Sequence, residues 1–371
     1  MKVNMMEKFD IVIAGCGIIG GILALALNKQ DLKVAVVEKK NLADLNAGQD
    51  YRATALSFGN FLYLQEILEQ DPRFLGAQIR KILAEDGILG PKVNFCADEF
   101  ASGAYFGVNV PNQILKTVIY DHLFKSKISF FENTSFEKAN IEAKLIIAAD
   151  GRNSGFAHQI PSQKFNIDYH QTAYVATLAL EKPIDTAYER FFKTGPIALL
   201  PLPSNQASLI WSLENHLIEP MKENLKEFVH IHLEGIVEDD FEILSQGYFP
   251  LQASFILPPY IKGLLLMGDA AHGMHPVAGQ GLNLGVRNIR ELTQLTQKYV
   301  SLGLDIGSES LLQEYWKNTK GHVLGLMGAT HGLIRIFDFE SKMISSFKKL
   351  GMRIFEKSQS IKKTAAYFAS H

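Results

Sequence analysis

Residues 9–38 read FDIVIAGCGIIGGILALALNKQDLKVAVVE, and this stretch decides the fold. An apolar run of strand length from Phe9 to Ala14 is followed by a glycine-rich turn and then by a helix-forming run from Ile22 to Leu27. The turn has the spacing G-x-G-x-x-G, and a second short apolar run ends at Glu38. Strand, glycine turn, helix and strand in this order predict a dinucleotide-binding unit.

Each glycine of the turn has a separate expected role. Gly15 lets the chain turn tightly, Gly17 leaves room for a pyrophosphate beside the backbone, and Gly20 lets the helix lie close to the strand. The helix N-terminus offers unpaired N–H groups to the phosphates. Glu38 lies 18 positions after Gly20, where such folds place the acid that accepts hydrogen bonds from a ribose.

The same stretch has two other interpretations. Ile11 to Leu27 carries no charge and approaches the length that spans a bilayer, but it contains four glycines. The tripeptide Ala14-Gly15-Cys16 resembles a lipoprotein cleavage box, but Glu7 and Asp10 interrupt the basic and apolar regions that should precede it. The dinucleotide interpretation is therefore favoured over both.

Composition indicates a globular protein that does not bind nucleic acid. The chain has 371 residues, 47% hydrophobic and 20% charged, which is enough for two domains with their own cores. Its 37 basic and 39 acidic residues give a net charge of -2 and no general affinity for polyanions. Cys16 and Cys96 form no C-x-x-C pair, which fits a reducing compartment without a zinc site. With no signal peptide evident, the cytoplasm is the expected location.

The rest of the chain predicts two kinds of structure. Residues 71–104 lose a regular period, and residues from about 160 to 257 form short aromatic and branched runs separated by turns, which predicts an antiparallel sheet. A short buried strand, Gly263 to Met267, precedes Gly268-Asp269 and a glycine-rich loop that extends to Gly281. Apolar residues at helical spacing follow, so a second strand, loop and helix unit is expected there.

Three further positions are candidates from their places in the chain. Arg52 precedes a predicted helix and could pair with pyrophosphate oxygens, although a solvated surface arginine is the plainer interpretation. Gln113 lies in the first turn of a helix expected from Pro111-Asn112 to about Phe124. Asp150-Gly151 follows a strand-like run and could equally form a simple turn.

Taken together, the motifs resemble those of a known family. The glycine turn with Glu38, the pair Asp150-Gly151, and Gly268-Asp269 with the loop after it resemble flavoprotein aromatic monooxygenases of the para-hydroxybenzoate hydroxylase type. Residues 52–57 (RATALS), 191–203 (FFKTGPIALLPLP) and 267–288 (MGDAAHGMHPVAGQGLNLGVRN) look like the ubiquinone-biosynthesis hydroxylases in particular. The resemblance covers nearly the whole chain.

The resemblance implies a role for each motif. The glycines of the first turn and Glu38 would hold the adenosine and pyrophosphate of FAD, with Arg52 and Gln113 along the pyrophosphate. Gln113 departs from the arginine that many relatives carry at this position. The residues implied near the flavin and the nicotinamide donor are Asp150, Gly151, Gly268, Asp269, Pro276, Gly279, Gln280 and Gly281.

The physical chemistry of flavin agrees with this loop. Reduced flavin carries negative charge on the pyrimidine edge of its ring, and Gly279 to Gly281 would direct backbone N–H groups and a helix N-terminus toward that edge. Pro276 would stiffen the loop that faces the ring. No residue of the sequence is identified as a catalytic base, because the cofactor carries the difficult chemistry.

The implied reaction is hydroxylation of the aromatic ring of a polyprenylated phenol in ubiquinone biosynthesis, with molecular oxygen, through a flavin hydroperoxide. NAD(P)H is the implied electron donor, although a second G-x-G-x-x-G is absent from the sequence. A dry pocket is needed, and the apolar strand from Ile197 to Leu202 and the glycine loop at 276–281 are its expected walls. Two alternatives remain: an FAD-dependent isoprenoid reductase or cyclase, and a non-catalytic FAD-bearing subunit of a quinone-biosynthesis complex.

The expected fold is α/β with a discontinuous, Rossmann-like FAD-binding domain and a second domain built on an antiparallel sheet. Residues 1–70, 105–160 and 258–340 are assigned to the FAD-binding domain, and residues 71–104 and 161–257 to the substrate domain. Residues 341–371 combine several lysines with apolar residues at helical spacing. This segment fits either a solvated last helix or a basic amphipathic helix in peripheral contact with the inner face of the membrane.

Two histidines close in sequence raise the possibility of a metal site. His272 and His275 are three positions apart, as two ligands on one turn could be. No carboxylate or third histidine follows at ligand spacing, and His272 is accounted for by the family loop. Neither Ser57 nor Ser154 lies in a nucleophile elbow, so acyl transfer has no support in the sequence. We expect no metal.

Overall fold

The computed structural model describes residues 6–48, 50–99, 105–275 and 279–338, together with residues 356 and 358. Pro276, which the sequence places in the flavin-facing loop, lies outside the described residues, as does almost all of the basic segment at 341–371. From that segment Glu356 is described, and its Oε2 accepts a hydrogen bond of 2.9 Å from the backbone N–H of Asn94.

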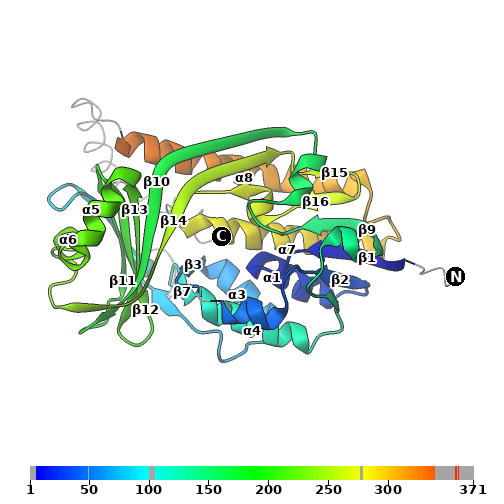
Figure 1. Cartoon of the computed structure of the whole chain (residues 1–371), viewed down its shortest axis with the longest axis horizontal. Helices are drawn as coiled ribbons and strands as arrows, with labels where there is room; N and C mark the ends of the chain where they lie inside the picture. The colour runs from blue at the N-terminus through cyan, green and yellow to red at the C-terminus, as the bar shows by residue number, and fades with distance from the viewer. Residues whose placement is uncertain are drawn as a thin grey trace.

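The first glycine turn follows the carboxyl end of β1, which is an inner strand of a six-stranded, mostly parallel sheet (Figure 1). Its order is β15-β16-β9-β1-β2-β8, and every neighbouring pair is parallel except β15 with β16. The second half of strand β1, residues 11–14, is apolar and buried, as expected for a strand covered on both faces. The strands are β1 (Glu7–Ala14), β2 (Val34–Val37), β8 (Ser129–Phe131), β9 (Ile141–Ala148), β15 (Tyr260–Ile261) and β16 (Leu264–Leu266).

Helix α1 packs very closely against two other helices, α4 and α7. On one side of α1, a Cβ added at Gly21 would lie 2.6 Å from the side chain of Ile119 in α4. On another side, a Cβ added at Gly285 of α7 would lie 2.4 Å from Ile19 of α1. Glycine therefore sets how closely these helices approach. The helices are α1 (Ile18–Asn28), α2 (Leu42–Ala47), α3 (Phe58–Ile67), α4 (Asn112–Phe124), α7 (Gln280–Ser301) and α8 (Glu309–Asp338).

A second sheet of eight strands has the order β17-β14-β10-β13-β12-β11-β5-β6. Helices α5 (Ile218–Glu223) and α6 (Leu225–His232) lie at its end of the molecule, where Trp211 is fully buried in the local core (Figure 1). The strands are β5 (Lys81–Asp86), β6 (Lys92–Cys96), β10 (Gln163–Leu180), β11 (Thr186–Phe192), β12 (Gly195–Leu202), β13 (Gln206–Glu214), β14 (Phe241–Leu257) and β17 (His272–Gly273). The antiparallel sheet expected from about 160 to 257 is confirmed.

Two of these strands link the ends of the molecule. Strands β10 and β14, of 18 and 17 residues, run together from the second sheet toward the parallel sheet (Figure 1). A small three-stranded sheet, β3-β7-β4, lies between the two larger ones (Figure 1). Its strands are β3 (Ala53–Ser57), β4 (Ala77–Ile79) and β7 (Gly107–Pro111).

The structure differs from the sequence expectation at two points. Residues 53–57, expected to lead into a helix, form strand β3, because β7 supplies antiparallel backbone partners for each of them. Gln280 and Gly281, expected in a loop, belong to the first turn of α7. Gly279 takes the left-handed conformation (φ 59°) and ends the loop one residue before that helix begins.

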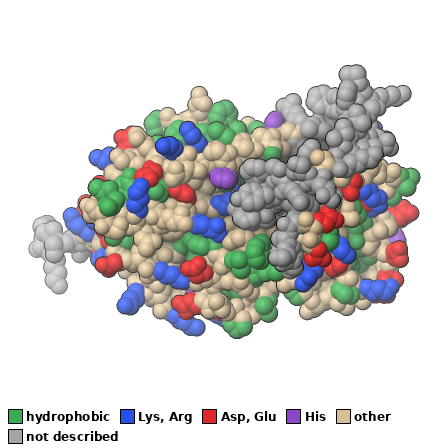
Figure 2. All heavy atoms as spheres, turned by 180° about the vertical axis from the view of Figure 1, so that it is seen from behind, with side chains coloured by type: hydrophobic (Ala, Val, Ile, Leu, Met, Phe, Trp, Pro, Cys, Tyr) green, Lys and Arg blue, Asp and Glu red, His purple; other side chains and the backbone are tan. Residues whose placement is uncertain are grey.

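The described surface carries charges of both signs. On the face shown in Figure 2, basic and acidic side chains are interspersed, in line with the small net charge. No helix in the described ranges combines the length and apolar composition needed to cross a bilayer.

Candidate cofactor site at the edge of the parallel sheet

Four candidate residues follow the carboxyl ends of four neighbouring strands. Gly15 comes after β1, Glu38 after β2, Asp150 shortly after β9 and Asp269 shortly after β16. Because these strands are parallel, all four loops lie along one edge of the sheet. Backbone N–H groups tie the loops together, from Gly15 to Val37 O (2.8 Å), from Ala149 to Ala14 O (2.8 Å) and from Met267 to Ala148 O (2.9 Å).

The first turn contains glycines of two kinds. Gly15 has φ 98°, and a Cβ there would lie 2.7 Å from the carbonyl oxygen of Ala149. A Cβ at Gly20 would lie 2.0 Å from the carbonyl oxygen of Gly15, so both positions need glycine for the packing of the chain itself. Gly17 has ordinary extended backbone, and a Cβ there would meet no atom of the described chain within 4 Å. A side chain at this position would face open space at the start of α1.

The carboxylate of Glu38 lies directly against this turn. Its Oε2 accepts a hydrogen bond of 2.7 Å from the backbone N–H of Cys16, and its Oε1 accepts one of 3.1 Å from that of Lys40. Burial, and to a lesser degree the charge of Glu38, raise the pKa of the Cys16 thiol well above its usual range. Cys16 is therefore an inert part of the turn and no nucleophile.

The two aspartates lie in different surroundings. Asp150 Oδ2 accepts a hydrogen bond of 3.2 Å from Gly155 N, whereas its Oδ1 is buried with no partner among the described residues. Solvent reaches Asp269, yet the surrounding protein raises its pKa by desolvation, against the lowering charges of Arg152 and Arg52. Arg152 and Arg52 are the basic side chains whose charges act on the Asp269 carboxylate.

One buried asparagine holds the start of α7 against β3 and α3. Asn283 Oδ1 accepts hydrogen bonds from Ser57 N and Asn60 Nδ2, both of 2.9 Å. Its Nδ2 donates to Ala55 O at 2.8 Å and to Gly279 O at 3.2 Å. Gly279 and Gly281 are thereby fixed beside the strand that follows Arg52. A Cβ at Gly281 would meet no described atom within 4 Å.

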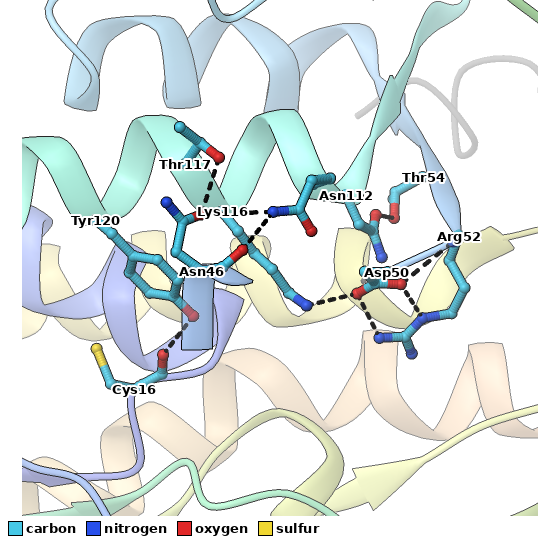
Figure 3. A network of polar contacts seen from close by, with 10 residues as sticks. Cys16, Asn46, Asp50, Arg52, Thr54, Asn112, Lys116, Thr117 and Tyr120 are labelled. Carbon is cyan, nitrogen blue, oxygen red and sulfur yellow. Dashed lines mark hydrogen bonds and ion pairs between the residues drawn. The ribbon is translucent and has the colours of Figure 1, made fainter. Parts of the chain in front are cut away.

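Arg52 belongs to a charged cluster around a buried carboxylate (Figure 3). The guanidinium of Arg52 makes two hydrogen bonds of 2.8 Å to Asp50, and Lys116 Nζ of α4 lies 2.8 Å from Asp50 Oδ2. The side chain of Asp50 is only 3% exposed. Burial alone would raise the pKa of Asp50, but its bonds to Arg52 and Lys116 outweigh burial and hold that pKa well below its usual range.

Gln113 turns toward α2. Its Nε2 donates a hydrogen bond of 2.6 Å to Asn46 O, and its Oε1 is buried with no partner in the described part of the chain. A cavity of about 390 Å³ opens beside it, between the loop before β3 and the second sheet. Arg52 and Gln113 line the cavity on one side, and Thr177, Leu202 and Ser245 line it on the other.

The described residues contain no group of three histidine, cysteine, aspartate or glutamate side chains placed to bind a metal. His272 and His275 are buried, and burial lowers the pKa of each to about 4. The imidazole Nε2 of His275 lies 3.1 Å from Gln171 Oε1 of β10. Both rings are therefore neutral parts of the packing between the sheet and the loop.

Some residues of the site are not apparent from the sequence. Asp50, Lys116 and Asn283 each bring together segments far apart in the chain, and Asp50 and Lys116 belong to none of the quoted motifs, whereas Asn283 lies within 267–288 but has no role assigned from the sequence. For Lys116 the sequence does carry a signal, because polar residues recur on one face of α4 at helical spacing, namely Asn112, Gln113, Lys116, Thr117 and Tyr120.

The fold and the loops at its edge define a dinucleotide-binding protein. A parallel sheet, a glycine turn at a helix N-terminus and an acid at the end of the second strand occur together here, as they do where a pyrophosphate and a ribose are bound.

Comparisons with known proteins identify the dinucleotide and the family. Residues 127–326 match the family model described as FAD binding domain. Ubiquinone hydroxylase UbiL of Rhodospirillum rubrum is 30% identical, in an alignment covering 95% of this chain and 87% of UbiL. The ubiquinone biosynthesis monooxygenase COQ6 of Schizosaccharomyces pombe is 26% identical, covering 96% and 91%. The crystal structure of p-nitrophenol 4-monooxygenase PnpA from Pseudomonas putida has the same fold, with TM-score 0.81, 16% identity and coverage of 98% and 99%.

The chain therefore belongs to the family of FAD-dependent aromatic hydroxylases, and its cofactor is FAD. The family resemblance expected from the sequence is confirmed, and so is the expected fold.

Proposed function

We propose that this protein is an FAD-dependent monooxygenase that hydroxylates the aromatic ring of a polyprenylated phenol in ubiquinone biosynthesis. The observation that carries the proposal is the convergence of Gly15, Glu38, Asp150 and Asp269 on one sheet edge. The similarity to UbiL and COQ6 over nearly the whole chain supports the same reaction class.

The residues at the edge fit an FAD molecule. Neither the backbone conformation nor the packing of the described chain explains why residues 17 and 281 are glycines, whereas close approach of a bound molecule would. The buried Asp150 Oδ1, which has no partner in the described ranges, would accept a hydrogen bond from a cofactor hydroxyl.

The proposed roles follow the path of the loops along the edge. Glu38 would bind the adenosine ribose, and the turn at residues 15–20 would bind the diphosphate together with Arg52. Asp269 and the N-terminus of α7 would lie toward the flavin end, with Gly279 and Gly281 allowing close approach. Gly151 and Gly268 would shape the cleft. Gln113, whose Nε2 is hydrogen-bonded to Asn46 O, would act mainly by its position beside the cofactor and less by direct contact with it.

Bound FAD would supply the redox chemistry, taking electrons from NAD(P)H and using them with molecular oxygen to insert one oxygen atom into the substrate ring. The protein itself binds, orients and excludes water. Leu202 lines the cavity beside Arg52, whereas Ile197 and Leu199 point into the core beneath the second sheet. The sequence predicts that the strand from Ile197 to Leu202 forms a wall of the substrate pocket. We propose that the Leu202 end of this strand forms that wall.

Two further assignments are part of the proposal. The cofactor domain would comprise residues 1–70, 105–160 and 258–340, with a substrate domain formed by 71–104 and 161–257. The pairing of β5 with β11 supports placing much of 71–104 with the second sheet. The basic segment at 341–371 would rest on the inner face of the membrane, where a polyprenyl substrate dissolves.

The experiment is a turnover assay with the purified full-length protein, NAD(P)H, oxygen and a short-chain prenylphenol. We expect a yellow protein, oxygen uptake that depends on the phenol, and a product heavier by one oxygen atom in mass spectrometry. A yellow protein that produces no hydroxylated phenol with any donor would contradict the proposal and favour a non-catalytic role. Reduction of a prenyl double bond without oxygen uptake would favour the reductase alternative.

A further inference from the structure

The polar face of α4 runs alongside the edge of the sheet on which the cofactor residues lie (Figure 3). Tyr120 OH donates a hydrogen bond of 3.0 Å to the carbonyl oxygen of Cys16 in the first glycine turn. Toward the other end of the helix, Asn112 Oδ1 accepts one of 2.7 Å from Thr54 of β3. Lys116 is one helical turn from each of these residues. Its Cα therefore lies between the glycine turn and the strand that follows Arg52.

Gln113, in the first turn of α4, supplies no charge to this part of the site. Gln113 is neutral, its Nε2 donates to Asn46, and the remaining oxygen can only accept hydrogen bonds. A diphosphate also only accepts hydrogen bonds, so Gln113 could offer it at most one neutral N–H, the second hydrogen of an Nε2 that already donates to Asn46 O and lies 3.5 Å from Asn46 Oδ1. A cation at this place must come from another residue.

Lys116 has the charge and the unused donors. Its side chain is 18% exposed, and Asp50 is its only acceptor among the described residues. An ammonium group carries three donors, so two remain for another acceptor. Asp50 also binds the guanidinium of Arg52, which joins the two cations through one nearly buried carboxylate. The three side chains together carry one net positive charge.

We propose that Lys116 and Arg52 form the cationic pair that receives the diphosphate of the cofactor, and that Asp50 is the residue that positions both. Lys116 thus takes the electrostatic role for which Gln113 is unsuited. The inference rests on FAD being the cofactor and on no feature of the hydroxylation.

The test uses the FAD-free full-length protein with two probes, ADP, which contains the diphosphate, and adenosine, which lacks it. At low ionic strength, Lys116→Gln should weaken ADP binding roughly tenfold, because a charge-assisted contact is lost, and leave adenosine binding unchanged. High salt should shrink the difference for ADP, because ionic screening weakens the contact in the unmodified protein. Lys116→Arg should restore most of the affinity.

A matched control separates this role from a general charge effect. Lys125, exposed at the end of the same helix, undergoes the same charge change in Lys125→Gln and should bind ADP as the unmodified protein does. The variants are compared by calorimetric titration and by thermal unfolding.

A double substitution tests whether Lys116 acts on the diphosphate or only balances the charge of the buried Asp50 carboxylate. If Lys116 acts on the diphosphate, Lys116→Gln still weakens ADP binding at least threefold in an Asp50→Asn background, where no buried carboxylate needs a partner. No further loss in that background would overturn the proposal, and so would an equal loss for adenosine. Because neither probe involves a phenol or oxygen, failure of the hydroxylation assay leaves this test valid.

Discussion

Gly17 and Gly20 belong to one sequence motif, but the packing of the chain requires glycine only at Gly20. A side chain at Gly20 would collide with the carbonyl oxygen of Gly15, whereas one at Gly17 would project into open space at the start of α1. The motif predicts both glycines from its spacing. Only the structure shows that the fold needs glycine at position 20 and not at position 17, where we propose that a bound diphosphate does.

Gly17→Ala should therefore impair FAD binding and not folding. The residue has φ -69°, which alanine adopts readily, so the free energy of unfolding should stay within about 0.5 kcal/mol. FAD affinity should fall at least about tenfold, because the methyl group occupies the approach to the backbone. Fluorescence titration of FAD and urea unfolding of the FAD-free protein measure the two quantities.

Gly20→Ala is the matched comparison. Its methyl group would lie 2.0 Å from Gly15 O, and the resulting displacement of α1 should cost about 2 kcal/mol or more in unfolding free energy. If the two variants lost stability equally, the distinction between their roles would be wrong.

The buried His272 is expected to make the free energy of unfolding depend on pH. Burial lowers the pKa of His272 to about 4, below its ordinary value of 6.5, so the folded protein keeps the ring neutral while the unfolded chain takes up a proton first. The stability that depends on this ring is complete above pH 6.5 and is lost as the pH falls toward 4. The loss should be about 2 kcal/mol between pH 7 and pH 5.

His272→Gln should remove this part of the pH dependence in urea unfolding measured at several pH values. His158→Gln, at an exposed position, should leave it unchanged. An unaltered slope in the His272 variant would show that its ring is not held neutral by burial.

At the scale of elements, the helices were the most predictable part of the chain. Helix α4 begins and ends where Pro111-Asn112 and Phe124 indicate, and α7 follows the apolar period expected after the glycine loop. Strand β3 was not predictable from its own residues, because its backbone partners come from β7, at least 50 residues later. Local sequence carries helix signals within one turn, whereas a strand depends on distant partners.

The junction of α7 with β3 depends on Asn283. Asn283→Ala would leave Ser57 N, Asn60 and Ala55 O without their buried partner, so unfolding free energy should fall by about 2–4 kcal/mol. FAD affinity should also fall, by roughly tenfold, because the first turn of α7 is no longer fixed beside Arg52.

Urea unfolding and FAD titration measure both effects. Asn318→Ala serves as the control, since Asn318 lies exposed on α8 with a hydrogen bond to Glu291. A stable Asn283 variant with unchanged FAD affinity would mean that the junction does not organise the site.

At the scale of the whole molecule, loops more than 250 residues apart meet at one sheet edge. The sequence indicated this through three separate motifs, and the strand order explains it, because β9 lies between β1 and β16. The polar face of α4 is visible in the sequence, but the cluster of Asp50, Arg52 and Lys116 was not predictable, since nothing in the sequence shows that this face meets the loop before β3. Likewise, the contribution of Leu202 to the cavity depends on how the second sheet sits against that loop.

The most direct test of the central claim is a crystal structure of the full-length protein with FAD bound. We expect the adenosine ribose at Glu38, the diphosphate between the turn at residues 15–17 and the Arg52–Lys116 pair, and the flavin end near Asp269 and the start of α7. FAD bound elsewhere, or with its diphosphate away from the glycine turn, would contradict it.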